Sequence, residues 1–209
     1  MGGGEPTVHI IDDDESLRRA LDGLFRSVGL KARGYGSVRE FLDGGIEDTP
    51  GCLVLDVRLP GLSGIDFQSQ LGDHGIHYPV VLMTGHGDIP MSVKAMKAGA
   101  QDFLAKPFRD QEMLDAVAAA IERDRQTRSS EDGKSRVQKL FTTLSPREQQ
   151  VMMLVTSGKM NKQAAGELGI SEITVKIHRG SAMRKMGART LADLVRMADL
   201  LKSTATRSR

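Results

Sequence analysis

The sequence reads VHIIDDDE at residues 8–15, a short apolar run that ends in four acidic residues. Continuous apolar runs of this length are typical of strands that are buried on both faces of a parallel sheet. Further runs of this kind lie at Cys52–Leu55, Val80–Met83 and Asp102–Ala105, and Lys31–Tyr35 is a weaker example. The sequence therefore predicts five short strands.

Segments with helical spacing separate these strands. Apolar residues recur every three or four positions in Ser16–Val28, so they fall on one face of a helix. The same spacing occurs in Gly64–Leu71, Ile89–Ala98 and Phe108–Arg123. Strands that alternate with helices indicate a doubly wound α/β domain with a five-stranded parallel sheet.

The charge of the chain is unevenly distributed. Residues 1–125 hold 13 Lys or Arg and 20 Asp or Glu, whereas residues 126–209 hold 16 and 7, so the net charges are −7 and +9. The total of +2 conceals this difference. A length of 209 residues is enough for two small domains, and the asymmetry predicts that the basic one binds a polyanion.

The composition disfavours several classes of protein. Cys52 is the only cysteine, so neither an intramolecular disulfide nor a zinc site built on cysteines can form. No apolar run approaches the roughly 20 residues that cross a bilayer, and no basic-then-apolar signal pattern begins the chain. We therefore expect a soluble, cytoplasmic protein without a membrane partner.

The second half of the chain contains no strand-like run. Ser145-Pro-Arg-Glu148 is a capping box with proline at the first helical position, and it opens a helix that ends near Ser157. The other predicted helices are Asn161–Leu168, Glu172–Met186, and one from Thr190 to about Leu201. A tight turn at Gly169 joins the first two of these. This pattern predicts an all-α, four-helix helix-turn-helix domain.

The segment between the two halves is polar. Residues 126–139 contain a single strongly apolar residue, Val137. Such a segment cannot bury a core face, so it is predicted to be an exposed linker that continues the preceding helix in part. The predicted division of the chain is a first domain at residues 5–124, a linker at 125–140 and a second domain at 141–203.

Polar side chains follow the predicted strands at their carboxyl ends. The first strand ends in Asp12 and Asp13, the third in Asp56, the fourth in Thr84 and the fifth in Lys106. Ligands of open α/β sheets bind at this edge, and the strand order 2-1-3-4-5 makes the first and third strands neighbours. Carboxylates this close need a cation, and oxygen donors suit Mg²⁺. The set predicts phosphoryl transfer to an aspartate.

Residues 7–123 resemble the receiver domain of response regulators, which has a flavodoxin-like fold. The matching motifs are VHIIDDDE, LDVRLPGLSG, TGHGDIPMSVKAMKAGA and DFLAKPF. The resemblance implies that Asp56 is the phosphoacceptor and that Lys106 contacts the phosphoryl group. It also implies that Thr84 and Phe103 form a switch pair and that the peptide between Lys106 and Pro107 is cis.

The same resemblance implies a site for Mg²⁺ or Mn²⁺. Its ligands would be Asp13, Asp56 and the backbone carbonyl of Arg58, with Asp12 acting through water, whereas Asp14 has no ligand role. An aspartyl nucleophile with Mg²⁺ also fits phosphatases of the haloacid-dehalogenase type. Those enzymes need a second acid two residues after the nucleophile, and that position is Arg58 here, which disfavours the enzyme hypothesis.

The predicted helix Glu172–Met186 has two different sides. At about 100° per residue, one side carries apolar groups that should pack against the other helices, namely Val175, Ala182 and Met186. Another side carries Ile173, Lys176, Ile177, Gly180 and Arg184. Lysine reads guanine or phosphate, an aliphatic group meets a thymine methyl, and a glycine permits close approach. This side is therefore predicted to enter the major groove of DNA.

Residues 142–202 resemble the LuxR-type helix-turn-helix domain. The matching motifs are LSPREQQV, SGKMNKQAAGELGIS and TVKIHRGSAMRKMGARTLADLV. Together, the receiver motifs and the helix-turn-helix motifs resemble the NarL/FixJ family of response regulators. The receiver motifs are more similar to its FixJ-like members. The resemblance implies that Lys176 and Ile177 face base edges and that Thr174 and Arg179 lie near phosphates. Gly180 stands where some relatives carry a larger or basic contact residue.

These resemblances imply a transcription regulator that is controlled by phosphorylation and is not a dedicated enzyme, although it slowly loses its own phosphate. The implied partners are a sensor histidine kinase, double-stranded promoter DNA, a second copy of the chain after phosphorylation, and RNA polymerase. Phosphorylation is expected to change the surface of residues 89–106, which promotes dimerisation or releases the DNA-binding domain, and the sequence leaves both open. A signalling adaptor with a solvated basic half is the competing hypothesis.

Overall fold

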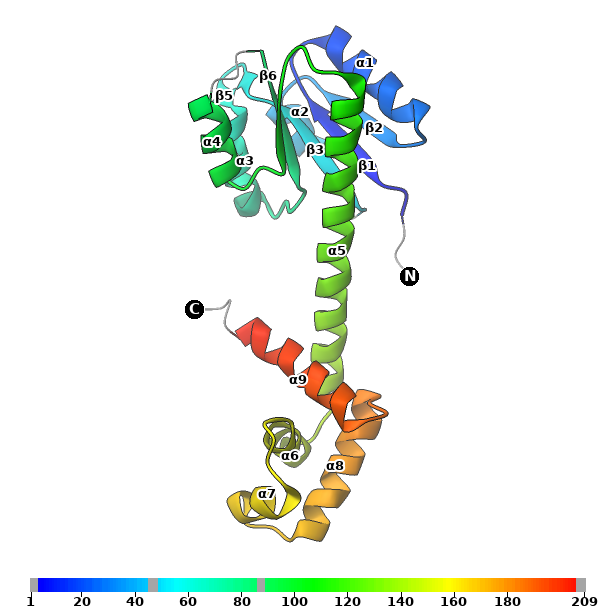
Figure 1. Cartoon of the computed structure of the whole chain (residues 1–209), viewed down its shortest axis with the longest axis vertical. Helices are drawn as coiled ribbons and strands as arrows, with labels where there is room; N and C mark the ends of the chain where they lie inside the picture. The colour runs from blue at the N-terminus through cyan, green and yellow to red at the C-terminus, as the bar shows by residue number, and fades with distance from the viewer. Residues whose placement is uncertain (1–3, 45–48, 86–88, 206–209) are drawn as a thin grey trace. The chain divides into compact units, whose positions relative to one another are not determined.

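A parallel sheet forms the centre of the first of two structural units, Met1–Arg128 (Figure 1). The structure, a computed structural model, describes residues 4–44, 49–85 and 89–205, and within these ranges the sheet has five strands. The strands are β1 (Thr7–Ile11), β2 (Lys31–Tyr35), β3 (Gly51–Asp56), β6 (Val80–Thr84) and β7 (Asp102–Ala105). Their order, β2-β1-β3-β6-β7, confirms the predicted fold class and strand order.

Helices cover both faces of this sheet. The apolar side chains of each strand alternate between two core clusters, so that Val8 and Ile10 of β1 lie on one face and Ile11 lies on the other. The helices are α1 (Glu15–Ser27), α2 (Val38–Asp43), α3 (Gly64–Gln70), α4 (Ile89–Lys97) and α5 (Asp110–Thr142). The first face packs against α1 and α5, and the second packs against α2, α3 and α4 (Figure 1). Burial on both faces explains the continuous apolar runs.

Several small elements of the first unit have no signal in the sequence periodicity. The six-residue helix α2 is capped by Ser37, whose hydroxyl accepts a hydrogen bond from the backbone N–H of Glu40 (3.1 Å), and it buries Phe41. An antiparallel pair of two-residue strands and a short 3-10 helix are also present, namely β4 (Arg58–Leu59), β5 (Leu62–Ser63) and Leu71–His74. Elements this short contain too few apolar residues to establish a period.

Helix α5 departs most from the sequence-based expectation. The pattern predicts a helix over residues 108–123 and a linker that is helical only in part, but α5 runs without interruption from Asp110 to Thr142. The predicted linker at residues 125–140 is rich in Arg, Lys, Glu and Gln, which favour helix, and it contains no proline. Its carboxyl end is also held by the second core through Val137. Despite its length, neither α5 nor any other helix of the described residues is apolar enough to span a bilayer.

The part of α5 in the first unit is anchored at the amino-terminal edge of the sheet. Asp124 is buried, and its carboxylate accepts hydrogen bonds from the backbone N–H of Gly51 (3.0 Å) and from Nε of Arg128 (2.7 Å). The guanidinium carbon of Arg128 also lies over the ring of Tyr78, 5.7 Å from its centroid. Helix α5 is thereby tied to the first residue of β3, the strand that carries Asp56 at its other end.

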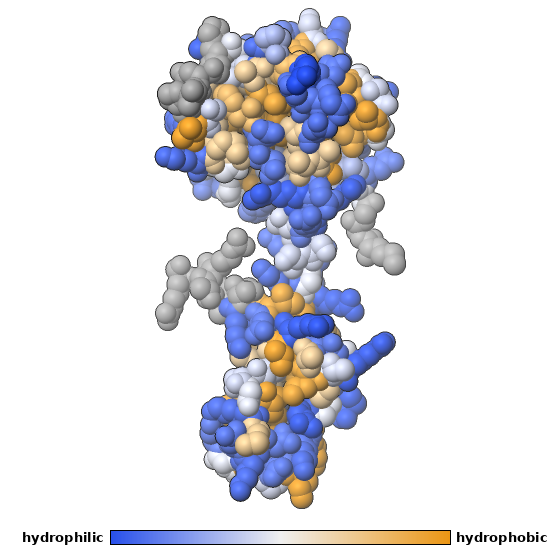
Figure 2. All heavy atoms as spheres, viewed as in Figure 1, coloured by the Kyte–Doolittle hydropathy of each residue, from blue (hydrophilic) through white to orange (hydrophobic). Residues whose placement is uncertain are grey.

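The second unit, Ser129–Arg209, consists of helices joined by short turns in its described residues. It contains the end of α5 and the helices α6 (Pro146–Thr156), α7 (Asn161–Leu168), α8 (Glu172–Met186) and α9 (Leu191–Ala205). These bounds agree with the predicted helices, except that α9 continues past Leu201. Gly169, between α7 and α8, has a φ of +64°, a left-handed conformation that glycine adopts without steric cost. Hydrophobic side chains reach the surface of this unit at several places between hydrophilic ones (Figure 2).

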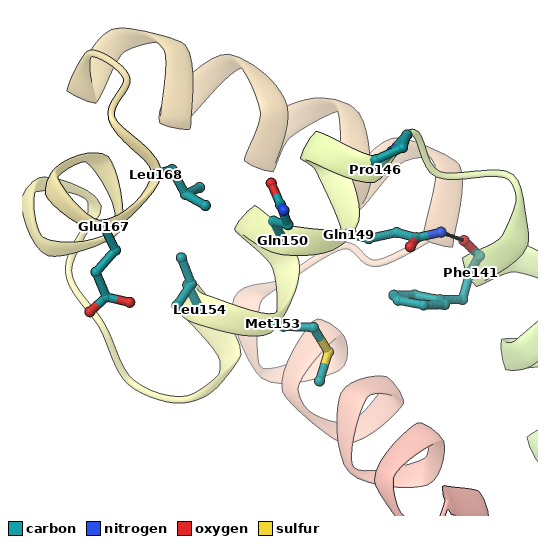
Figure 3. Close-up of a pocket in the computed structure, with 8 residues that line it drawn as sticks. All are labelled: Phe141, Pro146, Gln149, Gln150, Met153, Leu154, Glu167 and Leu168. Atoms are coloured by element: carbon teal, nitrogen blue, oxygen red, sulfur yellow. Dashed lines mark hydrogen bonds between the residues drawn. The ribbon is translucent and has the colours of Figure 1, made fainter.

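The last turn of α5 is held by α6. Phe141 packs against the core of the second unit, and the side-chain N–H of Gln149 donates to the backbone oxygens of Phe141 and Leu144, both at 3.2 Å (Figure 3). Phe141 lies in the last turn of α5, where a helix leaves carbonyls unpaired, and its carbonyl also accepts from the backbone N–H of Leu144 (3.1 Å). Beside them lies a groove of about 530 Å³, whose apolar lining includes Met153 and Leu154. The end of α5 is therefore an integral part of the second unit.

Candidate functional site

Carboxylates converge where β1 and β3 end. The ligand oxygens of Asp12, Asp13 and Asp56 all lie within 4.8 Å of one another. Asp12 and Asp56 are buried, whereas Asp13 is exposed. Because β1 and β3 are adjacent and parallel, their carboxyl ends meet at one edge of the sheet, as the predicted strand order requires.

Lys106 joins this cluster from the end of β7. Its ammonium nitrogen Nζ is 2.6 Å from Oδ2 of Asp12 and 3.2 Å from Oδ1 of Asp56. Burial disfavours the charge of Lys106, but the hydrogen bond and the charge of Asp12, together with Asp56, outweigh burial and raise the pKa of the lysine. The lysine is therefore a fixed positive charge beside the Asp56 carboxylate, and the peptide between Lys106 and Pro107 is cis, as expected.

The surroundings of Asp56 oppose its negative charge. Burial has the largest effect and raises the pKa of this carboxyl, whereas the charge of Lys106 lowers it. The charge of Asp12 also raises the pKa, and the backbone N–H of Arg58 lowers it. The net result is a raised pKa. Three carboxylates beside one ammonium also leave an excess of negative charge in a partly buried pocket. A hard divalent cation with oxygen ligands relieves this excess. The donor set therefore fits Mg²⁺.

The chain around the cluster restricts which residues fit. A Cβ on Gly64 would lie 2.2 Å from the backbone oxygen of Asp56, so only glycine is accommodated there. Asp14, beside the cluster in sequence, is engaged elsewhere as the cap of α1. Its carboxylate accepts hydrogen bonds from the backbone N–H groups of Ser16 (2.8 Å) and Leu17 (3.2 Å). Asp14 therefore has a structural role as a helix cap, and its lack of a ligand role stays a prediction.

Thr84 and Phe103 lie on the neighbouring strands β6 and β7. Thr84 is fully buried, and its hydroxyl donates to the sulfur atom Sδ of Met91 on α4 at 4.0 Å. Phe103 is half-buried and packs, like Met91, against the core under α2, α3 and α4. Met91 thus links Thr84 to α4. No sequence pattern indicates this contact, because it depends on how a helix packs on the sheet.

Helix α8 buries one side and exposes the other, as its periodicity predicts. The buried side carries Val175, Ala182 and Met186, which are fully buried. On the other side Lys176, Ile177 and Arg184 are exposed. Gly180 is half-buried, and a Cβ at this position would meet only the guanidinium of Arg184, at 3.8 Å. The outward side therefore combines cations, an aliphatic group and an open glycine.

Neighbouring residues orient Thr174 and Arg179, which are both half-buried. The hydroxyl oxygen of Thr174 is 2.8 Å from that of Ser171, which caps α8. The guanidinium of Arg179 donates to Oδ1 of Asn161, the first residue of α7, at 3.3 Å. Asn161 is a contact that the sequence pattern did not indicate, since it comes from the other helix of the helix-turn-helix.

A buried carboxylate ties α6 to α8. Glu148 is 5% exposed and accepts hydrogen bonds from Nζ of Lys185 (2.7 Å), the hydroxyl of Ser181 (2.6 Å) and the backbone N–H of Ser145 (2.7 Å). Lys185 first, then Ser181 and Ser145, lower the pKa of Glu148 to about 2. The sequence predicted the capping box with Ser145 but not the partners on α8. Glu148 thus fixes α8 against the rest of the unit.

Comparison with known families identifies both units. Residues 8–118 match the response regulator receiver domain, and residues 142–198 match the luxR family of bacterial regulatory proteins. A receiver domain followed by a LuxR-type DNA-binding domain defines a response regulator that acts on transcription. The chain belongs to the NarL/FixJ family of such regulators, which confirms the resemblance and disfavours the adaptor hypothesis.

Particular relatives match along almost the whole chain. Nodulation protein W of Bradyrhizobium diazoefficiens is 59% identical over 95% of this chain and 87% of its own length. The transcriptional regulatory protein FixJ of Azorhizobium caulinodans is 46% identical over 91% and 90%. Among solved structures, the response regulator StyR matches with a TM-score of 0.80 at 46% identity, over 94% of this chain and 99% of StyR. Full-length FixJ from B. japonicum matches with a TM-score of 0.57 at 38% identity, over 93% and 96%.

Proposed function

We propose that a sensor histidine kinase transfers a phosphoryl group to Asp56, and that this modification controls the binding of α8 to promoter DNA. The observation that carries the proposal is the cluster of Asp12, Asp13, Asp56 and Lys106 in a chain that also holds a LuxR-type domain. A nucleophilic carboxylate, acidic partners for a cation and a fixed ammonium are the groups that phosphoryl transfer requires. Since promoter DNA is the target, the protein is expected to act in the cytoplasm.

The transfer forms one bond and breaks another. A carboxylate oxygen of Asp56 attacks the phosphorus of a phosphohistidine, a P–O bond forms, the P–N bond breaks, and the imidazole leaves with the electron pair. Lys106, 3.2 Å from Asp56, neutralises charge on the phosphoryl oxygens. Asp13, Asp56 and the backbone carbonyl of Arg58 would hold Mg²⁺ or Mn²⁺, with Asp12 acting through water, and the ion would supply further neutralisation. Slow hydrolysis of the aspartyl phosphate then restores the carboxylate.

A groove beside Lys106 is the surface on which we expect the kinase to dock. The groove has a volume of about 760 Å³ and is formed by α1 and by the segment after β7. Its lining includes the apolar residues Leu17, Leu24 and Phe108, together with Lys106 itself. An amphipathic helix of a partner binds such an apolar groove. The position of the groove beside Lys106 would bring a histidine on that helix toward Asp56.

Replacing Ala20 by glutamate tests this docking surface. Ala20 is an exposed residue of α1 that lines the groove. The variant is expected to receive phosphate from an autophosphorylated kinase about tenfold more slowly, because the new carboxylate would be buried against an apolar partner. Labelling by acetyl phosphate, which needs only the carboxylate pocket, should keep its wild-type rate. If the kinase transferred phosphate to the Ala20→Glu variant at the wild-type rate, this result would contradict docking in this groove.

The output of phosphorylation is proposed to pass through Thr84. Movement of the Thr84 hydroxyl toward the phosphoryl group would break its contact with Met91, and Phe103 would turn inward behind it. These changes alter the outer surface of α4, where Val93 and Met96 are exposed. We propose that a second copy of the chain binds this surface, so that the dimer presents two copies of α8 to successive half-sites. Release of the second unit is the alternative, and an unchanged mass in solution after phosphorylation would favour it.

In the second unit, α8 is proposed to enter the major groove of promoter DNA. The net charge of +9 in residues 126–209 supports an approach to phosphates, and binding should weaken as salt rises. Lys176 and Ile177 would read base edges, and Thr174 and Arg179 would contact phosphates. The whole proposed contact set is Thr174, Lys176, Ile177, Arg179, Gly180 and Arg184. RNA polymerase is then the expected partner at the promoter.

Replacing Lys176 by alanine separates base reading from phosphate contact. Lys176 is exposed and is paired only loosely with Glu172, at 3.6 Å, so the substitution leaves the core intact. The loss of affinity for the preferred duplex should be about tenfold greater than the loss for random-sequence DNA, as measured by fluorescence anisotropy at constant salt. Lys202→Ala, which removes an exposed lysine of α9, is the control and should leave the ratio of the two affinities unchanged. Equal losses on both DNAs would make Lys176 a phosphate contact.

A further inference from the structure

Two isoleucines stand outward on α8. Ile173 is 69% exposed and Ile177 is 64% exposed. Single exposed apolar side chains are normal on a protein surface, but these two are one helical turn apart and form a continuous ridge. The ridge therefore needs an explanation beyond chance exposure.

The ridge faces directly away from the core. At about 100° per residue, Ile173 and Ile177 are about 40° apart around the helix axis, and each is about 160° from the buried Val175. Exposed cations border the ridge, with Lys176 beside it and Arg184 two turns further along. The outward side of α8 is thus apolar over its first turns, although a solvated helix face is normally polar.

DNA accounts for this ridge better than a protein partner does. A specific protein interface buries on the order of 800 Å² on each side and is depleted in lysine near its centre. The ridge is only two side chains long, and Lys176 lies against it. In the major groove, thymine presents an apolar C5 methyl group between the negatively charged phosphate backbones. A narrow apolar ridge with Lys176 beside it and Arg184 further along the same side is complementary to that pattern.

The spacing of the two side chains sets the spacing of their targets. Four residues of α-helix rise about 6 Å, and neighbouring base pairs are about 3.4 Å apart. Two isoleucines one turn apart therefore reach methyl groups about two base pairs apart. Gly180 follows on the same side of α8 and has no side chain of its own, so it does not hold the helix away from the bases.

We propose that Ile173 is a second methyl-reading residue of α8, and that Ile173 and Ile177 together make site selection depend on C5 methyl groups about two base pairs apart. Thymine supplies these groups, and 5-methylcytosine would supply the same contact. This proposal rests on the proposed function, because it requires α8 to lie in the major groove. It adds Ile173 to the base-reading residues as a determinant of specificity.

The test compares thymine with uracil, which pairs identically with adenine but lacks the C5 methyl group. The full chain, phosphorylated with acetyl phosphate, first selects its preferred sequence from duplexes with a randomised centre. The selected duplex is then prepared with deoxyuridine at one thymine position at a time. For the wild type, replacement at two positions about two base pairs apart should weaken binding about fourfold each. Ile173→Ala should lose sensitivity at one of these positions, and Ile177→Ala should lose it at the other.

The matched control is Leu191→Ala, which removes an apolar side chain that is 44% exposed at the start of α9. It should respond to uracil as the wild type does, and thermal melting checks that all variants are folded. A wild type that binds thymine and uracil duplexes equally would overturn the proposal and leave DNA binding by α8 intact. So would an Ile173→Ala chain that keeps the wild-type pattern. A full chain that selects no sequence from the pool would overturn the proposed function as well.

Discussion

Replacing Asp56 by asparagine should reduce phosphoryl labelling of the full chain from about one group per molecule to background, a loss on the order of 100-fold or more. An amide of nearly the same shape preserves the packing of the pocket but lacks the nucleophilic carboxylate beside Lys106. Intact-mass measurement after incubation with acetyl phosphate and Mg²⁺ gives the stoichiometry directly. Removal of divalent cations with a chelator should likewise abolish labelling of the wild type.

Asp14→Asn is the matched control for this experiment. It changes another carboxylate of the same acidic run, but one that caps α1 and lies outside the cluster. This variant should be labelled at the wild-type level. Full labelling of Asp56→Asn would show that another residue accepts the phosphoryl group. Undiminished labelling of the wild type in the presence of the chelator would show that the reaction does not require a metal ion.

The second large effect is expected in the stability of the second unit. Glu148→Ala should lower the free energy of unfolding of the second unit by about 2–4 kcal/mol, which corresponds to a fall in Tm of about 10–20 °C. The substitution removes the Glu148 side of the capping box of α6 and the hydrogen bonds to Lys185 and Ser181 at once. Urea denaturation of the full chain, followed by circular dichroism, measures the loss.

The control for Glu148 is Glu167→Ala. Glu167 is an exposed glutamate of α7 that is paired with Lys159, and exposed pairs contribute at most about 1 kcal/mol. Similar small losses for the two variants would contradict the role of Glu148 in joining α6 to α8.

Glu148 also predicts sensitivity of the second unit to acid. Its pKa is lowered from an ordinary value of 4.5 to about 2 in the folded protein, so the folded state favours the ionised form. The resulting stabilisation is fully present above pH 4.5 and is lost as the pH falls toward about 2. The wild type should therefore lose stability across this window in the same denaturation experiment, and Glu148→Ala should lose less.

The strands of the first unit were predictable to the extent that they are buried. β1, β3 and β6 are buried along their whole length, and each appears in the sequence as an apolar run, which only the buried His9 interrupts in β1. β2 is an edge strand that carries Lys31 and Arg33, so its signal is weak. The long helix α5 shows the limit of periodicity, since a helix held by a core at each end needs no apolar stripe between them.

The candidate site was predictable where the fold itself brings residues together. Strand order determines that Asp12 and Asp56 meet at one edge, so residue types and topology were sufficient to predict the cluster. The contacts of Met91 with Thr84 and of Lys185 with Glu148 could not be predicted in this way. They depend on the packing of separate helices, which a sequence pattern does not specify.

Phosphorylation of Asp56 is proposed to control DNA binding by α8. The most direct test is the affinity of the full chain for its selected duplex, measured with and without acetyl phosphate, for the wild type and for Asp56→Asn. Phosphorylation should tighten binding by the wild type about tenfold or more, because a dimer engages two half-sites, and it should not affect the variant. Equal affinities of the phosphorylated and unphosphorylated wild type would mean that phosphorylation of Asp56 does not control DNA binding.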